Sequence, residues 1–286
     1  QEMKQQKIFT YMGIAGCVLM VALAFVLFRG YRIKQSTNLT LERKNALIEE
    51  KQKEILDSIT YAKRLQEAIL PSFETMNKFF ADNFILYKPK DIVAGDFYWL
   101  EHVNGITFVA AADCTGHGVP GAMVSVVCSN ALNRSVLEFG ITDTGKILEK
   151  TRELVLETFS KSDKDVKDGM DISLLAINHN TKETSWSGAN NPLWIVRKVD
   201  KASPQLIEIK ADKQPIGKTE HPQPFTTHTI TVSKGDHIYL FTDGYADQFG
   251  GPKGKKFKYL QLKELLINTA NLTPVDQNHT LDVAFE

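Results

Sequence analysis

The stretch FVAAADCTGHGVPGAMVS, residues 108–125, indicates both the fold class and the position of a candidate site. A run of small apolar residues, typical of a buried strand, ends in Asp113, and a glycine-containing turn follows. Pro120 suits the first turn of a helix, so we expect a helix from about this residue to Phe139. A carboxylate beside a buried strand is costly to desolvate unless it is paired or binds a cation.

Two more acids stand beside expected strands. Asp243 follows the apolar run 238–241 and precedes a glycine, and Asp96 follows Gly95 at the start of an aromatic strand. Taken singly, an Asp-Gly pair after a strand is most often only a turn. Gathered at one sheet edge, the three acids would suit two hard cations such as Mg²⁺ or Mn²⁺, which prefer oxygen ligands and activate water. The residues alone leave both alternatives open.

The region after about Asn83 predicts an α+β fold. Short β-rich segments are separated by Gly, Pro, Asn or Asp turns. They cover residues 84–89, 96–101, 106–113, 172–178, 184–190, 193–199, 206–211, 225–232 and 237–243. Further helices are expected over 143–159 and 259–270. Because most connections are of hairpin length, the pattern favours antiparallel sheets layered with helices over a parallel βαβ sheet.

The segment Ile8–Phe28 carries no charge and is long enough to cross a bilayer as a helix of about 20 residues. A signal peptide is the alternative, but its apolar region is usually shorter and ends in a small-residue cleavage site. Basic residues are denser on the carboxyl side, at Arg29, Arg32 and Lys34. This bias predicts a single-pass protein with the rest of the chain in the cytoplasm.

Residues 37–70 lack Gly and Pro and predict a long linker helix that ends at Pro71. Five apolar residues recur in it at intervals of seven: Leu41, Ile48, Ile55, Ala62 and Ile69. The repeat favours a parallel coiled coil and therefore a homodimer, and the alternative is one amphipathic helix lying on its own domain. Residues 1–7 would then be the end of an upstream region, and 71–286 a separate domain.

Composition excludes several classes of protein. The 286 residues carry a formal net charge of +0, which gives no indication of nucleic-acid binding. Three cysteines without paired spacing, and scattered histidines, argue against a disulfide scaffold and a zinc site. The segment GHGVPG, residues 116–121, has no lysine where a phosphate-binding loop needs one, so a kinase-like or dinucleotide-binding enzyme is disfavoured.

Four segments together resemble the bacterial SpoIIE-type serine/threonine phosphatases of the metal-dependent, protein phosphatase 2C-like (PP2C-like) superfamily. They are IVAGDFYWL, ADCTGHGVPGAMVS, SGANNPLWIVR and IYLFTDGYADQFGG, within a resemblance that covers about residues 69–266. The resemblance implies an antiparallel β-sandwich flanked by helices. It also implies catalytic and metal-binding roles for Asp96, Asp113 and Asp243, with the backbone carbonyl of Cys114 as a further ligand, around two Mn²⁺ or Mg²⁺ ions.

The implied activity is hydrolysis of phosphoserine or phosphothreonine on a protein partner by a metal-activated water. The implied partner is a phosphorylated regulatory protein of the anti-anti-sigma type, and the implied location is the bacterial cytoplasmic membrane. The rival hypothesis is a non-catalytic signalling module that binds a partner through a degenerate phosphatase fold.

Three features depart from the family pattern. AGD replaces the commoner GGD before the first strand, and GANNP stands where many members have a histidine. The paired-aspartate strand that supplies another metal ligand has no match, since Asp276 and Asp282 lie in helix-like sequence. From this we expect the phosphatase domain, residues 71–286, to be incomplete at its C-terminus; the alternative is a form of the domain with impaired metal binding.

Overall fold

The computed structural model describes residues 2–161, 167–198, 203–251 and 254–286. The chain divides into two compact units, one up to Ser58 and one from Ile59 to Glu286. The helix α1, Glu2–Glu67, forms the first unit as far as Ser58. Its last residues, from Ile59 onward, belong to the second unit.

Helix α1 contains an 18-residue window with a mean hydropathy of 2.4, so it is long and apolar enough to cross a membrane. The apolar side chains of the expected membrane segment are all exposed, for example Phe9 and Leu19. Three residues of the seven-residue repeat, Leu41, Ile48 and Ile55, are exposed as well. These side chains are exposed to solvent in the single chain. A membrane or a partner helix would give them apolar surroundings.

Two antiparallel sheets form the centre of the second unit. The first has the strand order β1-β2-β3-β4-β7, and the second has the order β6-β5-β8. The strands of the first sheet are β1 (Phe97–Val103), β2 (Ile106–Cys114), β3 (Met170–Asn178), β4 (Thr184–Ala189) and β7 (His228–Ile230). Those of the second are β5 (Leu193–Arg197), β6 (Gln205–Ile209) and β8 (His237–Tyr239), and a ribbon pairs β9 (Phe249–Gly250) with β10 (Lys255–Lys256).

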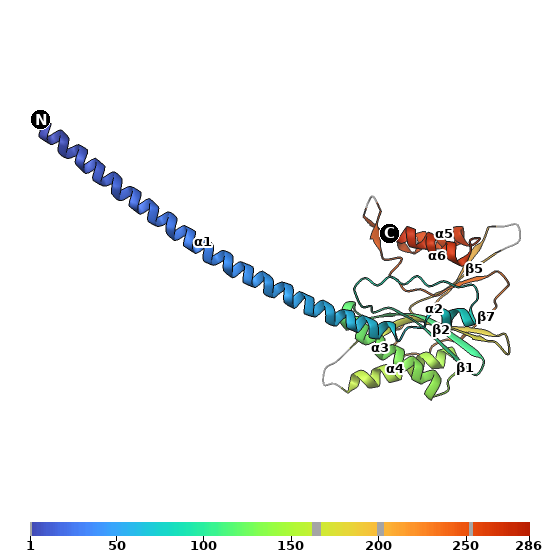
Figure 1. The fold of residues 1–286 in the computed structure, drawn as a ribbon. Coiled ribbons are helices and arrows are strands. Elements are labelled where there is room, and N and C mark those ends of the chain that lie inside the picture. Colours follow the sequence, from blue (N-terminus) through green and yellow to red (C-terminus); the bar gives the residue numbers. More distant parts are fainter. Residues whose placement is uncertain (1, 162–166, 199–202, 252–253) are drawn as a thin grey trace. The chain divides into compact units, whose positions relative to one another are not determined.

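Helices cover the outer face of each sheet, as Figure 1 shows. Those on the first sheet are α3 (Gly118–Asn133), the π-helix η1 (Arg134–Glu138) and α4 (Thr144–Ser160). Those on the second are α5 (Lys258–Thr269) and α6 (Pro274–Phe285), while the short α2 (Phe73–Phe79) follows α1. The layered, antiparallel α+β fold expected from the sequence is therefore confirmed.

The strands β3, β4 and β5 bury most residues on both faces because their side chains alternate between two cores. In β5, Leu193 and Ile195 pack in the core between the two sheets, whereas Trp194 and Val196 pack against α5 and α6. This alternation explains why the sequence of β5 is continuously apolar. A strand with water on one face would alternate apolar and polar residues.

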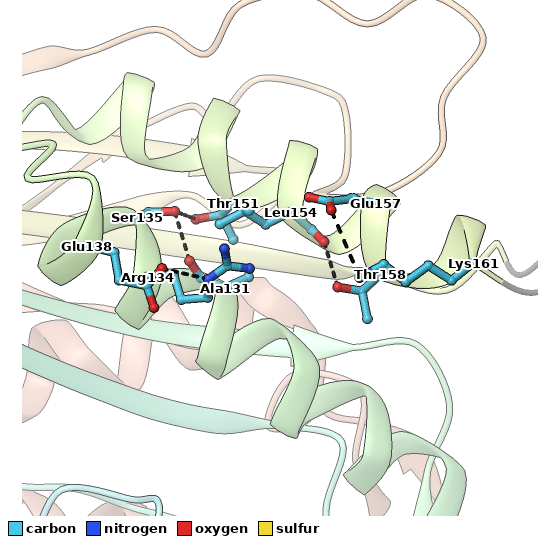
Figure 2. A network of polar contacts seen from close by, with 9 residues as sticks. All are labelled: Ala131, Arg134, Ser135, Glu138, Thr151, Leu154, Glu157, Thr158 and Lys161. Atoms are coloured by element: carbon cyan, nitrogen blue, oxygen red, sulfur yellow. Dashed lines mark hydrogen bonds and ion pairs between the residues drawn. The ribbon is translucent and has the colours of Figure 1, made fainter.

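A polar pair joins η1 to α4 inside the helical layer (Figure 2). Ser135 Oγ donates to the carbonyl of Ala131 at 2.8 Å and lies 3.0 Å from Thr151 Oγ1. Both hydroxyl-bearing residues are fully buried, so each needs the other as a hydrogen-bond partner. The contact fixes the end of α3 against α4, and α3 is the helix that begins beside Asp113.

Some expected boundaries were wrong. Residues 84–89 form no strand; Phe84 and Leu86 instead pack on the core beneath α5 and α6. The expected strand 237–243 ends at Tyr239, so Asp243 lies in a turn beyond β8 rather than directly at its end. The expected helix to Phe139 divides into α3 and η1, and strand 225–232 shortens to β7. Residue 199, the end of expected strand 193–199, lies outside the described residues.

Candidate metal centre

The three acids singled out in the sequence meet at one end of the sheets. Asp113 is the penultimate residue of β2, and Asp96 immediately precedes β1, which pairs with β2 from Phe97↔Ala112 onward. This register places the two acids side by side. The turn after β8 brings Asp243 to them, and the carboxyl of Asp113 hydrogen-bonds with the carboxyls of both Asp96 and Asp243.

Crowding of the three carboxyls changes their acidity. Burial, together with the charges of Asp96 and Asp243, raises the pKa of Asp113 to about 8. Burial also raises the pKa of Asp96, although hydrogen bonds from Thr242 and Asp113 oppose the shift. Among the described residues, no lysine or arginine forms an ion pair with any of the three. Without a cationic partner, the crowded and buried carboxyls favour the protonated form of Asp113.

Two hydroxyl groups orient Asp96. Thr242 Oγ1 donates to Asp96 Oδ2 at 2.6 Å, and the Tyr87 hydroxyl donates to the Asp96 backbone carbonyl at 3.0 Å. Thr242 is the neighbour of Asp243 in the chain, so one turn supplies both an acid of the cluster and the hydrogen bond that orients another.

Three glycines allow the loops around Asp113 to pack backbone against backbone. A Cβ at position 95 would lie 2.6 Å from the carbonyl oxygen of Gly116, and one at position 121 would overlap the same oxygen. Gly116 itself has φ +85°, a conformation that favours glycine. The glycines thus hold the segment before Asp96 against the turn after Asp113 and the start of α3.

Sequence reasoning missed a fourth acid, Asp171. It pairs with Asp113 across the β2–β3 ladder, and side chains so paired lie on the same face of a sheet. Burial raises the pKa of Asp171, the charge of Asp243 adds to this shift, and Asn190 Nδ2 donates to its Oδ1 at 2.8 Å. The available signal was an acid beside an apolar strand, but the strand expected over 172–178 begins after Asp171, whereas β3 begins at Met170.

The carboxyl oxygens of these acids are the kind of ligand that a hard divalent cation prefers, and they have no cationic partners. They are not arranged as a complete coordination shell. Within the described ranges, no group of three or more His, Cys, Asp or Glu side chains is arranged around a common metal position. The two acids near the C-terminus are engaged elsewhere: Asp276 accepts from Thr273 at the start of α6, and Asp282 pairs with Lys88.

Comparison with known proteins identifies the domain. The family model of stage II sporulation protein E (SpoIIE) matches residues 104–282, more than half of the chain. The chain belongs to the SpoIIE family. A sequence comparison with curated proteins gives no match.

Solved structures agree with the SpoIIE assignment. The SiaA-PP2C domain of Pseudomonas aeruginosa superposes with a TM-score of 0.72 at 28% identity, over 82% of this chain and 90% of that one. The RsbU and RsbW domains of a Mycobacterium tuberculosis protein give a TM-score of 0.52 at 21% identity, over 68% of this chain and 51% of that one. The PP2C phosphatase domain of SpoIIE from Bacillus subtilis, solved with a fragment of its regulatory domain, gives a TM-score of 0.51 at 19% identity. The match covers 68% of this chain and 53% of that one. The fold is thus that of PP2C-like serine phosphatase domains.

Proposed function

We propose that this chain is a membrane-anchored signalling phosphatase that hydrolyses phosphoserine or phosphothreonine on a protein partner. The observation that carries the proposal is the position of Asp113, hydrogen-bonded between Asp96 and Asp243 in a SpoIIE-family domain. Three carboxyls without a cationic partner do not stabilise the fold, since their mutual repulsion opposes folding. Their oxygen atoms are well suited to binding divalent cations.

Asp96, Asp113, Asp243 and the carbonyl of Cys114 would hold two Mn²⁺ or Mg²⁺ ions. When bound, such ions lower the pKa of water and stabilise charge on a phosphate ester under attack. Asp113 must release its proton to act as a ligand, and Thr242 keeps the Asp96 carboxyl oriented. Asp171, held by Asn190, extends the acidic wall of the site.

The N-terminal helix supports the remainder of the proposal. Residues 8–28 would anchor the chain in the bacterial cytoplasmic membrane, with the phosphatase domain, residues 71–286, in the cytoplasm. The helix α1 ends at Glu67, so Ile69 lies beyond it; the exposed helical residues of the repeat, Leu41, Ile48 and Ile55, would pair two linker helices in a homodimer. We propose as substrate a small phosphorylated regulatory protein of the anti-anti-sigma type, as the SpoIIE assignment favours.

Hydrolysis of a phosphoserine protein by the detergent-solubilised chain, with Mn²⁺ and with EDTA, tests the proposed activity. We expect phosphate release that requires Mn²⁺ and is lost in Asp243→Asn. A protein that binds the phosphoprotein tightly but releases no phosphate at any Mn²⁺ concentration would instead be the non-catalytic module.

Dimerisation through the linker is tested by Ile48→Glu. A charge at an apolar position of the seam should turn a dimer into a monomer in sedimentation experiments on the solubilised chain. The control is Glu49→Gln, an exposed neighbour outside the repeat. An unchanged sedimentation coefficient in Ile48→Glu would exclude the linker as the dimer contact.

A further inference from the structure

A small cleft opens beside Asp113, where β2 ends and β3 begins. Its volume is about 150 Å³, room for roughly five water molecules at about 30 Å³ each. Three chain segments form its walls, around Thr115, Lys167 and Pro215. A single anionic group fits a space of this size, whereas a folded segment of a partner does not.

Backbone hydrogen bonds hold the walls in place. Thr115 N donates to the carbonyl of Gly169 at 3.0 Å, and Met170 and Ile216 exchange two backbone bonds of 3.1 and 2.8 Å. Position 169 has to be glycine, because a Cβ there would overlap the carbonyl oxygen of Ile216. The cleft is therefore preformed at this end of β2 and β3.

Lys167 is the basic residue among those that line the cleft. Within the part of the chain that the structure describes, its ammonium group forms no ion pair. Two neighbouring carboxylates have other partners: Asp168 accepts from Thr115 Oγ1 at 2.8 Å, and Asp171 accepts from Asn190. The positive charge thus remains available to an anion that enters beside Asp113.

We infer that Lys167 binds an oxyanion of the substrate in this cleft. The oxyanion is either the phosphate of the phosphoserine or a carboxylate next to it in the substrate chain. The inference rests on the proposed function and adds a specificity residue to it. Lys167 is the cationic side chain among the residues that line the cleft, so an anionic group that enters beside Asp113 meets its positive charge there.

Binding of two fluorescent peptides tests the inference without requiring turnover. Each carries a phosphonate analogue of phosphoserine, which cannot be hydrolysed, with either acidic or neutral neighbours. In Mn²⁺ buffer, Lys167→Ala should weaken binding by about tenfold, and Lys167→Arg should retain most of the affinity. Lys146→Ala, an exposed lysine on α4, is the matched control. Loss with both peptides assigns the contact to phosphate, and loss with the acidic peptide alone assigns it to the neighbouring carboxylate.

Equal affinity of Lys167→Ala and the unmodified chain for both peptides would overturn the inference, as would absence of binding by the unmodified chain. Phosphate release from a hydrolysable phosphoserine peptide is measured separately. Binding that depends on Lys167 without any release would leave the inference standing and exclude the phosphatase activity, so the two failures are distinguishable.

Discussion

Replacing Asp113 by Asn should lower Mn²⁺-dependent phosphatase activity by about a thousandfold. The substitution keeps the shape of the side chain and removes the charge at the centre of the acid cluster. It should also stabilise the metal-free protein at pH 8, because one of three mutually repelling carboxylates is gone. An Asn amide can still donate to Asp96 and Asp243, so the packing is retained.

The pH dependence of stability follows from the raised pKa of Asp113. Its pKa is about 8 in the folded protein, against a usual value of 3.8. Between these values the folded state binds more protons than the unfolded state, so the free energy of unfolding falls as pH rises. This decrease in the free energy of unfolding ends once the pH exceeds the pKa of Asp113 in the folded protein. In EDTA at pH 8, Asp113→Asn should therefore be more stable than the unmodified chain by at least about 1 kcal/mol.

Thermal unfolding in EDTA at pH 5.5 and pH 8 measures this effect, and the activity assay is run beside it. Asp247→Asn is the control, since this acid follows the same turn but pairs with Lys256 at 2.6 Å. A variant at Asp113 with full activity, or with lower metal-free stability than the unmodified chain at pH 8, would contradict the assigned role.

Replacing Gln66 by Leu should uncouple the linker helix from the acid cluster. Gln66 is the buried residue of α1, with 8% of its surface exposed. Its amide accepts from Ala94 N at 3.0 Å and donates to the Ala94 carbonyl at 2.6 Å and to Ser125 Oγ at 3.0 Å. Ala94 is two residues before Asp96, and Ser125 lies on α3. One side chain of the linker thus holds both the segment before Asp96 and helix α3.

Leucine at position 66 leaves these buried polar groups without partners. We expect a loss of about 2–3 kcal/mol in the free energy of unfolding and a Tm lower by about 5–10 °C. We also expect the Mn²⁺ concentration for half-maximal activity to rise, because the segment that carries Asp96 is no longer held. Gln66→Glu should restore part of the loss, since its carboxylate still accepts from Ala94 N.

The control for Gln66→Leu is Gln205→Leu, an exposed position on β6. A merely structural role would lower the Tm without changing the Mn²⁺ dependence of the remaining activity. That result would contradict a positioning role for Gln66 while leaving its part in stability intact.

The sequence was sufficient for features that depend on local pattern. Short β-rich segments joined by hairpin-length turns predicted the layered α+β fold, and their position beside expected strands marked Asp96, Asp113 and Asp243. It did not reveal features that arise when distant segments meet. Gln66 reads as one more polar residue of a charged helix, and only packing against Ala94 makes it a buried hydrogen-bonding group. Asp171 was missed because its relation to Asp113 depends on the register of β2 and β3.

Calorimetric titration of Mn²⁺ into the unmodified chain and into Asp113→Asn at pH 7 tests the central claim most directly. If the acid cluster is a metal centre, the unmodified chain binds up to two ions. Binding also releases a proton, because Asp113 is protonated at this pH without metal. Asp113→Asn then binds at least tenfold more weakly and without that proton. Equal binding by both proteins, or none by either, would show that the three acids do not form a metal centre in this chain.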